Sequence, residues 1–205
     1  MPNEDPRLSQ SVTLQLCGLD PERESLDFRQ REVLSALSED SKAVYSFQGL
    51  RRKLGLHQEI LSRTLDRLEE QNLVEKTSDG YRINSDKDAD QFGYVTEGPA
   101  TESHVVTAHL SGEADVTLIL NTLKGRWFGE FRWLGYSEIP SGLVLSWITD
   151  DGRVQLRAKI SGDTLVISAL YRSGTDADRA TMSAFELFDF LTRQNSLPAR
   201  HGILN

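Results

Sequence analysis

The sequence has few of the features that mark secreted or membrane proteins. Its single cysteine, Cys17, cannot form an intrachain disulfide, and no cysteine-rich zinc pattern can be built from it. No run of 18 apolar residues is present, so we expect no membrane span. The first ten residues are polar and lack the basic and then apolar order of a signal peptide. These absences predict a cytoplasmic protein that has no membrane partner.

Catalytic and metal-binding motifs are also missing. The chain has no Gly-x-Ser-x-Gly elbow, phosphate-binding loop, His-Glu-x-x-His pair or dinucleotide fingerprint. His104 and His109 are five residues apart, a spacing that suits a shared metal neither on a strand nor on a helix. Asp150 and Asp151 precede a glycine, which indicates a turn rather than a catalytic pair. We therefore expect no enzymatic activity, no cofactor and no metal.

Positive charge is scarce, and where it occurs is informative. The chain has 23 basic and 31 acidic residues, for a formal net charge of -8, which argues against a general nucleic-acid coat protein. Residues 28–85 are the exception, with 10 basic and 9 acidic side chains. A locally basic face on an acidic body can still bind DNA, because phosphate contacts depend on local charge.

The pattern of apolar residues divides the chain into four parts. Residues 1–27 form an N-terminal arm with a short strand at Ser11–Leu16, and residues 86–103, rich in Asp and Gly, form a linker.

Residues 104–205 contain strands and helices of a second domain. We expect strands at 104–110, 126–136, 143–149, 153–160 and 164–171, and helices at 114–123 and 176–194. Arg153, Gln155, Arg157 and Lys159 alternate with apolar residues, which predicts one solvent-exposed sheet face. The predicted fold class is α+β, with an antiparallel sheet in the C-terminal domain and helices packed on one of its faces.

The segment 28–85 has the clearest local signals. Asp27 and Gln30 form a capping box for a first helix, whose apolar face we expect to include Phe28. Ser46 caps a second helix, Phe47–Leu54, which ends at Gly55. A third helix begins near His57, with Leu61, Leu65 and Leu68 on its buried side. The segment Lys76–Ile83 then forms a hairpin around Ser78-Asp79-Gly80.

This segment resembles the winged helix-turn-helix domains of MarR- and ArsR-like regulators. The resemblance is carried by Leu50–Val74, LRRKLGLHQEILSRTLDRLEEQNLV, and by the hairpin sequence EKTSDGYRI that follows. Asn72 stands where these families often have glycine. The match covers about 58 of the 205 residues. It implies a transcriptional regulator that binds double-stranded DNA through the helix after Gly55.

If that helix enters the major groove, its outward side chains would contact bases. Gln58 suits adenine and Arg63 suits guanine, while Ser62 suits a base or a phosphate. Glu59 would either accept from cytosine or simply repel phosphates. The basic residues of the preceding helix and of the hairpin are expected to hold phosphates. The predicted DNA-binding residues are Arg51, Arg52, Lys53, His57, Gln58, Glu59, Ser62, Arg63, Arg67, Lys76 and Arg82.

Two further expectations concern partners. One recognition helix covers only a few base pairs, so we expect a homodimer, with Asp176–Gln194 and the strand near Val12 at the contact. An alternative stays open, because winged helices also serve as protein–protein interaction modules without DNA binding. A cluster such as Arg51-Arg52-Lys53 is often only a solvent-exposed face.

The second half concentrates the large aromatic residues. Trp127, Phe131, Trp133 and Trp147 form either part of a core under the sheet or the lining of a pocket for a small apolar or aromatic effector. Regulators commonly join a winged helix to a sensor domain, and the effector hypothesis rests on that analogy.

Overall fold

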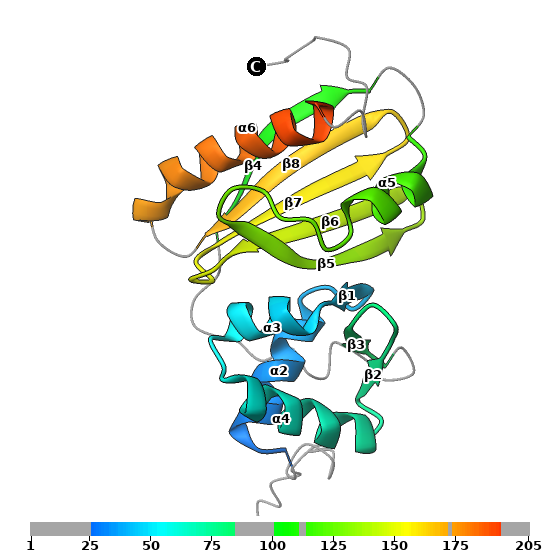
Figure 1. Cartoon of the computed structure of the whole chain (residues 1–205), viewed down its shortest axis with the longest axis vertical. Helices are drawn as coiled ribbons and strands as arrows, with labels where there is room; N and C mark the ends of the chain where they lie inside the picture. Colours follow the sequence, from blue (N-terminus) through cyan, green and yellow to red (C-terminus); the bar gives the residue numbers. More distant parts are fainter. Residues whose placement is uncertain (1–25, 85–100, 111–113, 172–173, 194–205) are drawn as a thin grey trace, which may run out of the picture.

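The computed structural model describes residues 26–84, 101–110, 114–171 and 174–193 (Figure 1). The chain is a mixed α/β protein. Its helices are α2 (Phe28–Ser38), α3 (Phe47–Leu54), α4 (Gln58–Glu70), α5 (Val116–Leu123) and α6 (Ala177–Arg193). Its strands are β1 (Ala43–Tyr45), β2 (Val74–Lys76), β3 (Tyr81–Ile83), β4 (Thr101–His109), β5 (Phe131–Ile139), β6 (Gly142–Thr149), β7 (Val154–Ser161) and β8 (Thr164–Tyr171).

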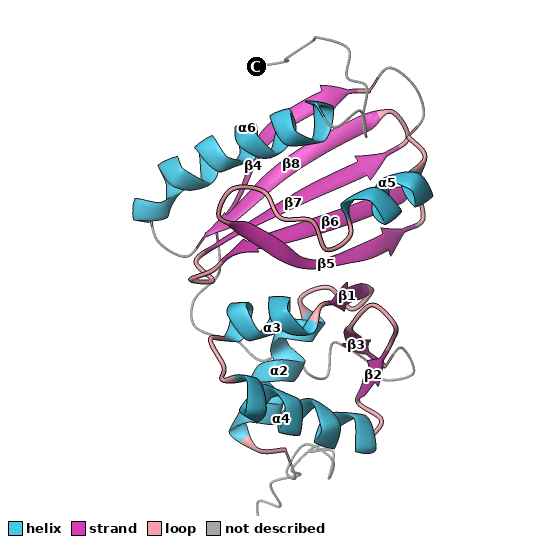
Figure 2. Cartoon of the chain, in the orientation of Figure 1, coloured by secondary structure: helices cyan, strands magenta, loops and turns pink. Residues whose placement is uncertain are grey.

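All eight of these strands belong to one antiparallel sheet in the order β2-β3-β1-β5-β6-β7-β8-β4 (Figure 2). The predicted antiparallel sheet is therefore confirmed, but it is larger than the sequence indicated. β1 was not predicted, and it pairs with β3 of the N-terminal hairpin on one side and with β5 on the other. Through β1 the two halves of the chain share a single sheet.

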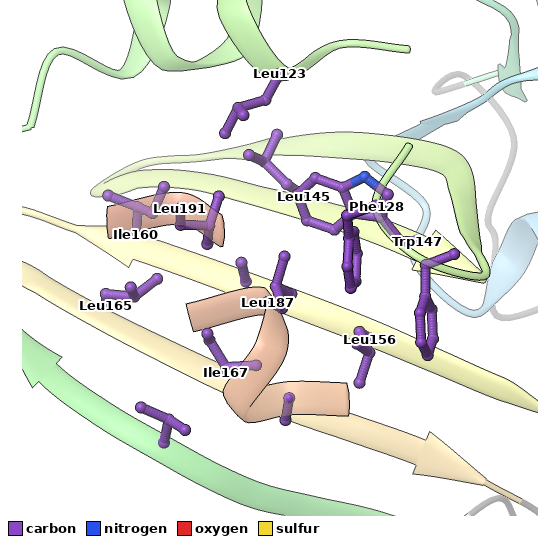
Figure 3. Packing of buried hydrophobic residues seen from close by; sticks show 14 of the residues in the cluster. Leu123, Phe128, Leu145, Trp147, Leu156, Ile160, Leu165, Ile167, Leu187 and Leu191 are labelled. Carbon is purple, nitrogen blue, oxygen red and sulfur yellow. The ribbon is translucent and has the colours of Figure 1, made fainter. Parts of the chain in front are cut away.

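Helices α5 and α6 cover one face of the strands β5 to β8, and the main core lies between them (Figure 2). Figure 3 shows Leu187 of α6 close to Ile167 and Leu191 of α6 close to Ile160 of the sheet. The opposite face of β5 and β6 contributes Leu134 and Ile148 to a second core, which α2, α3 and α4 complete. The sheet is thus a wall shared by two hydrophobic cores.

Local signals account for the N-terminal helices. Asp27 accepts from the backbone N–H of Gln30, and the Gln30 side chain accepts from the backbone N–H of Asp27, each at 2.8 Å. Ser46 Oγ accepts from the backbone N–H of Gly49 at 3.0 Å. Gly55 adopts a φ of 62°, as expected for a helix C-terminus. The predicted caps and the predicted break between α3 and α4 are confirmed.

Four details of the sequence prediction were wrong. Phe28 is exposed rather than part of the buried face of α2. β4 begins at Thr101, inside the expected linker. β5 begins at Phe131 instead of residue 126, because Arg126–Glu130 form a loop held by a 3.0 Å hydrogen bond from Trp147 Nε1 to the Arg126 carbonyl. The face of β7 that was expected to be exposed to solvent is partly covered. Gln155 on this face is buried, and its side chain accepts a hydrogen bond from Lys53 of α3.

The buried side of α6 also differs from the prediction. Helical spacing in the sequence predicts an apolar stripe of Met182, Phe185, Phe188 and Leu191, but Met182 and Phe185 are exposed while Leu191 is buried. The residues that face the sheet are Ala180, Ala184, Leu187 and Leu191. Alanine lets a helix approach a sheet closely, so small residues rather than the largest apolar ones mark this interface.

The junction between the halves is built from α3 and the turn between β6 and β7. A Cβ atom added at Gly152 would lie 2.6 Å from the Arg52 carbonyl oxygen, so the turn abuts the end of α3. Asp150 accepts from Arg52 Nε at 2.9 Å and pairs with Arg132 at 3.1 Å. Asp151 accepts from Thr149 Oγ1 at 2.6 Å and pairs with Arg179 of α6 at 3.3 Å. The turn therefore connects α3, β5 and α6.

Some predictions fall on parts of the chain that the structure leaves undescribed. The expected strand Ser11–Leu16, Cys17 and residues 86–100 of the expected linker lie outside the described residues. Among the helices within the described ranges, none is long and apolar enough to cross a membrane.

Gly49 yields a test of the packing between α3 and β5. A Cβ atom there would lie 2.6 Å from the Leu134 carbonyl oxygen and 2.7 Å from Leu134 Cα. Gly→Ala inside a helix normally stabilises by about 1 kcal/mol. Here we expect Gly49→Ala to lower the free energy of unfolding by about 1–3 kcal/mol, because the added methyl overpacks the junction. Urea denaturation measures this change, and Gly174→Ala, where an added Cβ meets nothing within 4 Å, serves as the control. A Gly49→Ala protein as stable as wild type would contradict the close approach.

Candidate nucleic-acid interface

Helix α4 is fixed on one side and open on the other. Leu61, Leu65 and Leu68 are fully buried in the N-terminal core, at the spacing that the sequence predicted. The turn before α4 is closed by a 3.2 Å hydrogen bond from the Leu56 backbone N–H to the Arg51 carbonyl. Leu56 itself is buried. The side of α4 opposite the leucines consequently faces solvent.

The outward side chains of α4 are accessible but partly paired. Gln58, Glu59, Arg63 and Arg67 are exposed, and Ser62 is half-buried. The side chain of Arg63 is 73% exposed, and its guanidinium lies 2.5 Å from Glu59 Oε1. Arg67 lies 3.4 Å from Asp27 Oδ2. Both pairs are on the surface, where such pairs contribute little to stability and exchange readily for other partners.

A hollow lies where α3 meets α4. It is open to solvent, has a volume of about 700 Å³, and brings together five of the predicted residues. Its lining consists of Arg51, Gly55, Leu56, His57, Gln58, Glu59 and Ser62. The His57 ring accepts a long contact, 3.4 Å, from the backbone N–H of Glu59 at the start of α4. One cation, Arg51, one carboxylate, Glu59, and several neutral hydrogen-bonding groups therefore surround the helix N-terminus.

Arg52 and Lys53 do not join this surface. Lys53 Nζ contacts Glu39 at 2.8 Å and Gln155 Oε1 at 3.2 Å, and Arg52 is held by Asp150. The Arg52 side chain is only 14% exposed and the Lys53 side chain only 10%. The prediction that they hold phosphates is not supported, because both cations hold α3 against the rest of the chain.

The hairpin between β2 and β3 is anchored at its tip. Asp79 pairs with Lys124, which follows α5, and accepts a 3.0 Å hydrogen bond from the Tyr136 hydroxyl. The Lys124 ammonium holds the pKa of Asp79 below its usual value, with the Tyr136 hydroxyl acting in the same direction. Burial, and secondarily the hydrogen bond to Asp79, raises the pKa of Tyr136 to about 12. The tip is thus bound to the second half of the chain.

The two basic residues beside that tip remain at the surface. Lys76 is exposed, with its ammonium 5.9 Å from the centre of the Tyr81 ring. Arg82 Nε donates to Glu75 at 2.9 Å. Only Lys76 therefore carries a charge without an acidic partner among the contacts of this hairpin.

Charge along the outward side of α4 is uneven. Glu59 and Arg63 balance each other in the N-terminal half of the helix. The C-terminal half exposes one basic residue, Arg67, and three acidic ones, Asp66, Glu69 and Glu70. Since phosphates repel carboxylates, any anionic partner is expected to approach the N-terminal half.

Ile60 also belongs to this surface, although it is not among the DNA-binding residues predicted from the sequence. It is 42% exposed in the first turn of α4. Its position, one residue before Leu61, places it about 100° away from the leucine side of the helix. Helical spacing alone would therefore have identified it as an outward apolar residue.

Three of the four aromatics predicted to line an effector pocket form core instead. Phe131, Trp133 and Trp147 are buried, and the rings of Trp133 and Trp147 meet edge to face at 5.5 Å. Phe128 stacks on Phe131 at 4.9 Å and lies beside Trp147 in Figure 3. Trp127 is 61% exposed, and the Arg132 guanidinium lies 4.5 Å from the centre of its ring. The sequence was compatible with either a core or a pocket for these aromatic residues, and the structure places Phe131, Trp133 and Trp147 in the core.

His104 and His109 lie apart from this surface, on β4. Ser168 Oγ and His104 Nδ1 are 3.0 Å apart, and His109 lies 3.8 Å from Asp163. Within the described ranges, no three His, Cys, Asp or Glu residues are grouped to hold a metal ion.

Comparisons with protein-family models, curated proteins and solved structures return no match for this chain.

The anchored hairpin tip gives a pH-dependent prediction. We expect Asp79→Asn to lower the free energy of unfolding by about 1 kcal/mol at pH 7, because the Lys124 and Tyr136 contacts lose their charged acceptor. The folded pKa of Asp79 is lowered, so this stabilisation is present above the unfolded pKa and is lost as pH falls through the folded pKa. Urea denaturation at pH values from 7 to below the unfolded pKa of about 4 should show wild type and variant converging as the pH falls. A difference that stays constant over this range would show that the Asp79 charge contributes nothing.

Proposed function

We propose that residues 28–83 form a winged helix-turn-helix and that the chain is a DNA-binding transcriptional regulator. The order helix, strand, helix, helix and hairpin supports this proposal, together with the pairing of β1 with β3. In this proposal α4 is the recognition helix and β2–β3 is the wing. The tip of this wing is bound to Lys124 and Tyr136, so phosphate contacts from the wing would come from Lys76.

One observation carries the proposal: the leucine side of α4 is buried while Gln58 and Arg63 are exposed next to an open hollow. A helix held in this way can enter the major groove without any rearrangement of its own domain. Arg51 is placed to contact a phosphate at the edge of the hollow. Gln58 would contact adenine and Arg63 guanine.

A selection experiment tests this function and the role of Arg63. The full chain is incubated with random DNA duplexes of about 20 base pairs, bound duplexes are enriched, and affinities are measured by fluorescence anisotropy. We expect a defined sequence to emerge, and Arg63→Ala to weaken its binding by about 1–3 kcal/mol and to relax selectivity at one base.

Lys159→Ala is the matched control, since it removes one exposed positive charge from β7. We expect this variant to bind the selected duplex almost as wild type does. Equal binding of selected and unselected duplexes by wild type would count against the regulator, and an unchanged Arg63→Ala isotherm would remove Arg63 from the interface.

A second candidate is a protein–protein interaction module, which the acidic C-terminal half of α4 favours. Asp66, Glu69 and Glu70 would repel phosphates but suit a basic protein surface. The anchored wing tip is also compatible with a module whose wing does not contact DNA. The selection experiment separates the two candidates, because an interaction module enriches no duplex sequence.

We also propose a homodimer that forms through α6. Met182 and Phe185 point away from the sheet, and large exposed apolar side chains on a helix suit a subunit contact. Sedimentation equilibrium should give twice the mass of one chain for wild type, and the mass of one chain for Met182→Glu combined with Phe185→Glu. Leu118→Glu on α5, which changes another exposed apolar residue, is the control and should stay dimeric. A wild-type monomer would dismiss the proposal.

The small-molecule effector retains less support. Of the four aromatic residues predicted for its pocket, only Trp127 is accessible. The loop that carries Trp127 is fixed by the Trp147 hydrogen bond, so an effector would meet a surface residue rather than a cavity between the core rings.

A further inference from the structure

We infer that Ile60, together with Glu59 and Arg63, gives this protein a preference for a thymine methyl group beside a G·C base pair. The inference rests on the proposed function and deepens it, because it assigns a base-specific role to the apolar residue of the recognition surface. Single exposed apolar residues are common on protein surfaces. The position of Ile60 among polar reading residues is what makes it informative.

Ile60 is rigidly presented. Ile60 lies within the first turn of α4. Its carbonyl accepts a 2.8 Å hydrogen bond from the Thr64 hydroxyl. Its β-branched side chain has essentially one rotamer available in a helix. Little conformational entropy is therefore lost when it contacts a partner, which favours its use as a fixed contact.

The neighbours of Ile60 define where a ligand would lie. Arg63 is three residues further on, so the two side chains are adjacent on the helix surface. They are separated by about 4.5 Å along the helix axis. Base pairs stack about 3.4 Å apart, so these side chains would meet the same or neighbouring base pairs. Gln58 and Glu59 belong to the same turn as Ile60.

The chemistry of the major groove then selects the base. The only apolar feature on the edges of the standard base pairs there is the C5 methyl group of thymine. Isoleucine can pack against that methyl but can make no hydrogen bond to a base. A pyrimidine without the methyl group leaves this contact unfilled.

The ion pair between Glu59 and Arg63, beside Ile60, would select the neighbouring base pair. Glu59 Oε1 lies 2.5 Å from the Arg63 guanidinium, which keeps the charge of Arg63 close to the first turn. An arginine donates to guanine O6 and N7, and a glutamate accepts from cytosine N4. The two side chains together match the two halves of one G·C pair. The carboxylate also stays neutralised near the phosphates.

Uracil substitution provides the test. In the duplex selected by the full chain, each thymine is replaced in turn by deoxyuridine, which removes only the methyl group. We expect one substitution to weaken wild-type binding about fourfold, the loss that corresponds to one buried methyl group. Ile60→Ala should bind the thymine and uracil duplexes equally, because its side chain no longer reaches the methyl.

Controls keep this result specific. Ile60→Val retains a branched apolar side chain and should keep most of the discrimination. Lys159→Ala changes an exposed residue of β7, outside the proposed DNA-binding surface, and should keep all of it. Uniform tolerance of uracil by wild type would overturn the inference while leaving DNA binding intact, and so would discrimination that survives in Ile60→Ala. Failure to select any duplex sequence would instead overturn the proposed function itself, and this inference with it.

Discussion

The pairing of β1 with β5, and the close packing of α3 on the same strand, determine how the rest of the molecule is arranged. Ala43, Val44 and Tyr45 align with Ser137, Tyr136 and Gly135, which inserts the N-terminal unit into the sheet of the second half. Ser46 extends the connection by donating from its backbone N–H to the Leu134 carbonyl at 2.8 Å. The first two turns of α3 therefore have a fixed orientation relative to β5. The surface that we propose for DNA binding is therefore connected directly to the sheet of the second half.

This connection uses charges that the sequence had suggested for DNA. Arg52 and Lys53 both make their contacts inside the chain. Partly buried pairs of this kind position elements more than they add stability, because desolvation offsets much of the attraction. What remains for a partner is the N-terminal half of α4, together with Arg51 and Lys76. A small surface with few free cations suits recognition through a limited number of specific contacts better than general attraction to a polyanion.

The sequence predicted features that depend on nearby residues. The Asp27–Gln30 capping box, the break at Gly55 and the leucine side of α4 were all correct, since each signal lies within one or two helical turns. β1 was missed because three residues carry no periodicity, and its stability comes from partners about 90 residues away. The roles of Arg52 and Lys53 were unpredictable for the same reason. Their contacts Asp150 and Gln155 are 98 and 102 residues away.

The turn formed by Asp150, Asp151 and Gly152 has a practical consequence for protein engineering. Exposed hairpin tips are usually the safest places for affinity tags, fluorophores or inserted domains. This tip is unsuitable, because it touches the end of α3 and holds Arg52, Arg132 and Arg179 at once. The tip between β7 and β8 is contacted as well, because the backbone N–H groups of Leu110 and Ala114 donate to the carbonyls of Asp163 and Gly162.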